Sequence, residues 1–158
     1  MTKELKQEFT LKISQANKTE LVVILYEMLL AYVEDAKSAH NKQDQEGFRQ
    51  GIKRARACLH ELMSSLHFEY ELAGNLLQLY GYVDRAMTRA DVKNSVEELA
   101  DVEEMITKLH DAYQTVSEKD TSGPVMSNAQ TVYAGLTYGK NQLTESLADQ
   151  GSSRGFRV

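Results

Sequence analysis

The chain of 158 residues contains one cysteine, one proline and no tryptophan. Because Cys58 is the only cysteine, an intramolecular disulfide and a cluster of thiolate metal ligands are both excluded. Cys58 precedes Leu59 on the apolar side of a predicted helix, which favours a buried structural thiol over a reactive one. Proline breaks helices, so a single proline, Pro124, indicates that the chain before it forms long helices.

Long apolar runs and an excess of positive charge are also missing. The longest apolar run, 21–31, is interrupted by Glu27 and is shorter than the about 20 residues that span a bilayer. Residues 1–10 are charged and lack the apolar core of a secretory signal, so we expect a cytoplasmic protein without membrane insertion. The net charge of −5 argues against nucleic acid as a partner, since phosphate binding needs a basic surface.

The four histidines form no catalytic or metal-binding pattern. Di-iron helical bundles place a glutamate three residues before histidine, and here these positions hold Lys37, Ala57, Ser64 and Thr107. His40 lacks a lysine and a glycine at the spacing of a phosphotransfer histidine. No glycine-rich loop carries the lysine–serine pair of a phosphate site. We therefore predict no catalytic residue, no cofactor and no metal site. The alternative is a helical-bundle enzyme whose catalytic residues these patterns do not identify.

Apolar residues recur at three- and four-residue steps in four segments, which predicts four helices. Asn17 and Glu20 form a capping-box pattern before the first helix, and Asp44 is the expected cap of the second. The predicted helices cover residues 18–41, 45–66, 71–90 and 94–118. Helices of this length with short loops predict an all-α protein, an antiparallel four-helix bundle.

The composition divides the chain into four parts. We expect a mobile N-terminal arm over 1–16, the bundle over 17–118, a linker over 119–127 and a C-terminal extension over 128–158 that is partly helical. The linker is predicted from its Lys-Asp-Thr-Ser-Gly-Pro composition.

The first predicted helix carries more apolar residues than a core requires. Residues 21–33 are apolar on nearly every side, whereas one core-facing stripe needs about three positions in seven. Surplus apolar surface of this kind marks a partner site. A homodimer interface would leave the same pattern, so both interpretations stay open at this point.

Five short patterns follow one another between residues 9 and 117: Ala16–Val22 (ANKTELV), Leu25–Met28 (LYEM), Glu61–Leu66 (ELMSSL), Asn75–Val83 (NLLQLYGYV) and Arg89–Asp91 (RAD). Their order and intervals resemble the FliS family of flagellin-specific export chaperones. The family pattern begins Ala-Ser-Pro-x-x-Leu-Ile and continues Leu-Tyr-Asp-Gly. This chain departs from it in having Lys18 in place of the proline, Met28 in place of a small residue, and Glu69–Tyr70 in place of a glycine pair.

The resemblance implies a cytoplasmic chaperone that binds the C-terminal segment of flagellin, prevents its premature polymerisation and delivers it to the flagellar export gate, part of a type III secretion system. An amphipathic client helix needs an apolar groove, which the first predicted helix can supply. The candidate partner-binding residues are Leu21, Ile24, Leu25, Met28, Tyr80 and Tyr82. The alternative is a helical homodimer with a general interaction or structural role.

Two segments of the chain itself are candidates to occupy the same groove as weak competitors. In the extension, Val132 and Leu136 are spaced like the anchors of a helical ligand. In the arm, Phe9 and Ile13 offer the same spacing. The sequence does not rank the two segments.

Overall fold

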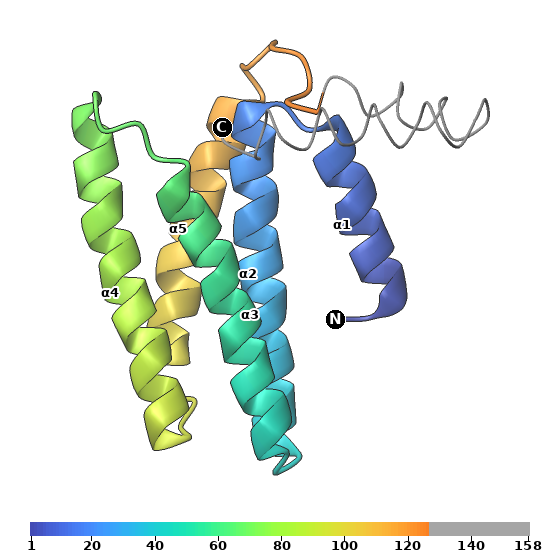
Figure 1. Cartoon of the computed structure of the whole chain (residues 1–158), viewed down its shortest axis with the longest axis vertical. Helices are drawn as coiled ribbons and strands as arrows, with labels where there is room; N and C mark the ends of the chain where they lie inside the picture. Colours follow the sequence, from blue (N-terminus) through green and yellow to red (C-terminus); the bar gives the residue numbers. More distant parts are fainter. Residues whose placement is uncertain (127–158) are drawn as a thin grey trace, which may run out of the picture.

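The computed structural model describes residues 1–126 (Figure 1). Within this range the protein is all-helical, with five helices and no strand. The helices are α1 (Lys3–Gln15), α2 (Lys18–Asn41), α3 (Gln45–Ser64), α4 (Glu71–Lys93) and α5 (Leu99–Ser117). The residues of the predicted C-terminal extension, including Val132 and Leu136, lie outside the described range.

Side-chain caps mark the starts of α2 and α3, and a left-handed backbone conformation marks the end of α4. The capping box predicted for α2 is confirmed, because the Asn17 side chain accepts from the backbone of Glu20 at 2.8 Å. Asp44 caps α3 as predicted and accepts from the Gly47 backbone at 2.9 Å. Asn94 adopts a left-handed conformation (φ 50°) and thereby ends α4.

Helices α2 to α5 surround one shared core, and successive helices run in opposite directions (Figure 1). Helix α2 packs on α3 and α5, and α4 packs on the same two helices. The core includes the fully buried side chains of Tyr26, Phe48 and Ile106. Deep in this core, the hydroxyl groups of Tyr26 and Tyr80 are hydrogen-bonded at 2.5 Å.

Helix α1 lies outside this core, beside α2 and away from α4 (Figure 1). The sequence predicted a mobile arm here, whereas the structure contains a 13-residue helix. Its N-cap is Thr2, whose hydroxyl accepts from the Leu5 backbone at 3.2 Å. Leu5, Phe9 and Ile13 are four residues apart and all pack in the small cluster between α1 and α2.

The predicted start of the fourth helix was wrong. The observed helix, α5, begins at Leu99 instead of Asn94, because the chain turns over residues 94–98 after the left-handed Asn94. For the same reason α4 extends to Lys93, beyond the predicted end at Ala90. No helix within residues 1–126 offers an apolar stretch sufficient to cross a membrane.

Candidate partner-binding site

The surplus apolar residues of α2 form a continuous strip that α1 covers. The strip consists of Leu21, Ile24, Met28 and Ala31, which recur at three- and four-residue steps along one face. Below, these four residues are called the α2 strip. Leu21 and Ile24 are each 6% exposed, and they pack in one cluster with residues of α1 and with Met1 and Ala16 beside it.

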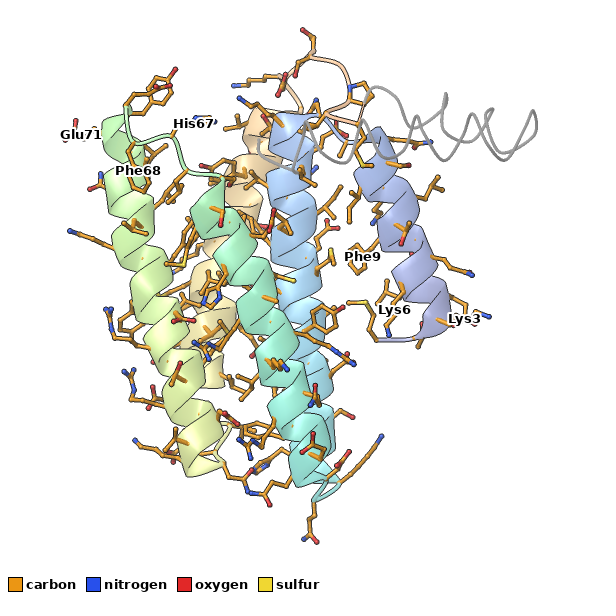
Figure 2. The ribbon with its side chains drawn as sticks, in the orientation of Figure 1. Lys3, Lys6, Phe9, His67, Phe68 and Glu71 are labelled. Carbon is orange, nitrogen blue, oxygen red and sulfur yellow. The ribbon has the colours of Figure 1, made fainter. Side chains whose placement is uncertain are left out.

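The cover over the α2 strip is small. Phe9 is the only buried residue of α1, and Leu5 and Ile13 are partly buried beside it. Figure 2 shows Phe9 directed toward α2, whereas Lys3 points away from it. Neither Phe9 nor Ile13 belongs to the shared core of α2 to α5, so α1 packs on α2 through a separate apolar cluster, which adjoins the core at Met28.

One ion-pair chain crosses the edge of the α2 strip. Lys12 on α1 lies 3.0 Å from Glu8 and 3.6 Å from Glu27 on α2. Glu27 also contacts the Nε2 atom of His110 on α5 at 3.2 Å. The hydrogen bond with Glu8 is the main cause that raises the pKa of Lys12, with a further contribution from Glu27. These pairs are partly exposed, so they orient α1 more than they stabilise it.

His110 adds a second contact to this chain. Its Nδ1 atom lies 3.0 Å from a carboxylate oxygen of Asp111. Burial disfavours the charged imidazole, but hydrogen bonds with Asp111 and Glu27 outweigh it and raise the pKa of His110. A protonated His110 therefore holds Glu27 in place beside Lys12.

The structure separates the six predicted binding residues into three groups. Leu21, Ile24 and Met28 belong to the α2 strip. Leu25 and Tyr80 are buried in the shared core, and Tyr80 also lines a pocket between the start of α2 and the start of α4. Tyr82 is 40% exposed on α4, which lies on the other side of α2 from α1 (Figure 1).

A second apolar surface surrounds the amino-terminal half of α4. Its residues are more than a third exposed: Phe68, Tyr70, Leu72, Leu77, Leu79 and Tyr82. We call them the α4 surface. A groove on one side of α4 continues to Met63 of α3, and another reaches Met105 of α5. Figure 2 shows Phe68 in the loop that precedes α4.

The sequence prediction included only Tyr82 of this surface, although a signal was present. Leu76 and Leu77 are adjacent, so both cannot face the same core. Leu76 is buried and Leu77 is exposed. An apolar residue next to a core position marks the outward face of a helix more directly than the total number of apolar residues does.

The part of the chain that the structure describes, residues 1–126, contains no grouping of three side chains suited to a metal ion. His40 and His60 contact different groups, the Asn94 carbonyl and the Asp84 carboxylate. Cys58 is buried, as predicted, and its burial raises the pKa of the thiol to about 11.

Comparison with known proteins identifies the family. The sequence model described as "Flagellar protein FliS" matches residues 1–120. The chain belongs to the FliS family. A related member is the "Flagellar secretion chaperone FliS" of Bacillus subtilis (strain 168), which is 27% identical over 108 residues. The match covers 68% of this chain and 81% of the relative, so the FliS resemblance found in the short sequence patterns is confirmed.

Proposed function

We propose that this FliS protein is a cytoplasmic chaperone that binds the C-terminal segment of flagellin, prevents its polymerisation and supports its delivery to the flagellar export gate. The observation that carries the proposal is the α2 strip, an apolar face covered only by a small helix outside the core. The name of the Bacillus subtilis relative supports the role in secretion. The proposal involves no catalytic step, cofactor or metal.

A chaperone for a polymerising protein has to bind an apolar strip and later release it. Leu21, Ile24 and Met28 present anchors at the spacing that an amphipathic client helix matches. A client that becomes ordered on binding loses conformational entropy, so a large contact area gives only moderate affinity. Release at the export gate is then possible without unfolding of the chaperone.

Helix α1 is the natural competitor for this strip. Phe9 and Ile13 occupy the positions on Leu21 and Ile24 that we assign to client side chains. Because α1 is tethered, its effective concentration at the strip is high even when its intrinsic contact is weak. The tail residues Val132 and Leu136 stay a second proposed competitor, outside the described residues.

The proposal is tested by calorimetry with a peptide that spans the C-terminal segment of flagellin. We expect saturable binding with a negative heat-capacity change, because apolar surface is buried on both partners. A scrambled peptide of the same composition is the control and should give no saturable heat. Absence of binding by the native peptide at high micromolar concentration would contradict the proposal.

The α4 surface supports one alternative, a homodimer with a structural role. Leu79 and Tyr82 are exposed and border the groove toward Met105, where a second copy of α4 could pack. Light scattering separates the two functions. A stable dimer that does not bind the flagellin peptide would favour the homodimer.

A further inference from the structure

The chain changes direction between α1 and α2 through two extended residues, Ala16 and Asn17. Their ψ angles are 136° and 179°. Both residues are buried, with 1% and 3% exposed. Burial is unusual for an asparagine side chain and requires hydrogen-bond partners. The direction of α1 over the α2 strip depends on how firmly this corner is held.

The partners come from the segment after α5, which the sequence predicted to be only a linker. The Val125 backbone donates to the Ala16 carbonyl at 2.8 Å. The Asn17 side chain donates to the carbonyls of Asp120 and Ser122, both at 3.4 Å. The Thr19 hydroxyl donates to the Asp120 carboxylate at 2.6 Å, the shortest of these contacts. The segment thus binds the end of α1 and the start of α2 together.

Asp120 is held by the segment itself as well as by α2. Its second carboxylate oxygen accepts from the Ser122 backbone at 2.9 Å and from the Ser122 hydroxyl at 2.5 Å. Hydrogen bonds with Ser122, and then with Thr19, lower the pKa of Asp120 to about 2. Asp120 is therefore ionised at neutral pH, and its bond with Thr19 is charge-assisted.

We propose that residues 120–125 form a clasp that holds the α1–α2 corner and thereby sets how often α1 leaves the α2 strip. The cover of Phe9 and the ion pairs of Lys12 with Glu27 and of the Met1 ammonium group with Asp35 hold α1 along α2, and the clasp holds its C-terminal end. The hydrogen bonds of the clasp residues with the rest of the protein go to the corner, to Ala16, Asn17 and Thr19. Any event that displaces residues 120–125 would then free α1. The predicted link to client affinity rests on the proposed function, whereas the link to α1 opening does not.

The test measures amide hydrogen exchange of the full chain by mass spectrometry, with peptides from α1 compared with peptides from α3. Thr19→Val removes the hydroxyl that donates to Asp120 and keeps the side-chain shape. Thr121→Val is the matched control, because Thr121 is exposed and its hydroxyl makes no hydrogen bond among the described residues. We expect Thr19→Val to accelerate exchange in α1 by roughly three- to tenfold and to leave α3 unchanged.

A second pair of variants separates the role of the carboxylate from general destabilisation. Asp120→Ala should accelerate α1 exchange as Thr19→Val does, whereas Asp120→Asn should lie between this variant and the wild type, because its amide oxygen still accepts from Thr19. Equal exchange in Thr19→Val, Asp120→Ala and the control overturns the clasp, as does equal acceleration of every helix.

Affinity for the flagellin peptide separates the two explanations, because general destabilisation of the fold would not make the peptide bind more tightly. If the clasp keeps α1 closed, Thr19→Val should bind the peptide more tightly than Thr121→Val, by the factor by which α1 opening increases. Faster α1 exchange with no peptide binding by any variant would support the clasp and contradict the proposed function. Faster α1 exchange with unchanged peptide affinity would overturn the clasp as a regulator of the client site.

Discussion

At the scale of single residues, α3 approaches α2 closely at Gly51. A Cβ atom at this position would lie 2.7 Å from the Cβ and 2.8 Å from the backbone nitrogen of Ala36 on α2. Glycine lowers helix stability elsewhere, so its presence here is explained by the contact between backbones. Ala36 is fully buried, which leaves no room for α2 to move aside.

Gly51→Ala should therefore lower the free energy of unfolding, by about 1–3 kcal/mol, although alanine is the better helix former. Gly74→Ala on α4 is the matched control, because no atom lies within 4 Å of its added Cβ. That change should raise stability by about 0.5–1 kcal/mol. Urea denaturation of both variants checks the prediction, and a Gly51→Ala protein as stable as Gly74→Ala would refute the close packing of α2 and α3.

At the scale of helices, α1 differs from the other four because its removal leaves the shared core intact. All its buried contacts are in the small cluster with the α2 strip, centred on Phe9. A helix held by so few apolar residues opens more readily than the whole protein unfolds. Opening of α1 exposes Leu21 and Ile24 and makes the strip available to a client.

Phe9→Ala should consequently tighten binding of the flagellin peptide, because it lowers the fraction of molecules in which α1 covers the strip. Each 1.4 kcal/mol removed from the closed state gives up to about tenfold in apparent affinity. The thermal midpoint should change little, since Phe9 lies outside the shared core. Leu11→Ala is the control, because Leu11 is on the same helix and 59% exposed. Peptide affinity that is equal in the two variants, or weaker in Phe9→Ala, would show that α1 does not compete.

Helices α2 to α4 could be predicted from the sequence, and α1 could not, for a physical reason. The cap residues Asn17 and Asp44 predict where α2 and α3 begin, and a long apolar stripe follows each of them. In α1 the stripe has only three members, and its remaining positions are mostly polar, so the pattern resembles that of an arm. Its helical state depends on packing against α2, which no local pattern within residues 1–16 contains.

At the scale of the whole molecule, most of the exposed large apolar side chains within residues 1–126 belong to the α4 surface, and the α2 strip lies on the other side of α2. The α2 strip is covered by α1, and the α4 surface is exposed. The sequence indicated a surplus of apolar residues on α2, and Leu21, Ile24 and Met28 lie in the α2 strip; their role in partner binding stays a prediction. The sequence could not assign Leu25 to the core, because the orientation of a helix that is apolar on nearly every side is decided by its neighbours. Tyr80 on α4 is also in the core, where its hydroxyl group meets that of Tyr26, a contact that depends on the tertiary arrangement.

The corner between α1 and α2 meets a segment more than 100 residues later in the sequence at one end of the molecule. The end of α1, the start of α2 and the residues after α5 are joined there through Ala16, Asn17 and Asp120. The linker that the composition predicts is thus also a structural contact. The hydrogen bonds that make it so depend on the tertiary arrangement, so composition alone could not show them.

The central claim is that the client binds the α2 strip and displaces α1. The most direct test is amide hydrogen exchange of the full chain, free and saturated with the flagellin peptide. We predict faster exchange in α1 and slower exchange in the first half of α2 in the complex, because the client replaces α1 on Leu21 and Ile24. An α1 that stays as protected in the saturated complex as in the free protein would contradict the claim.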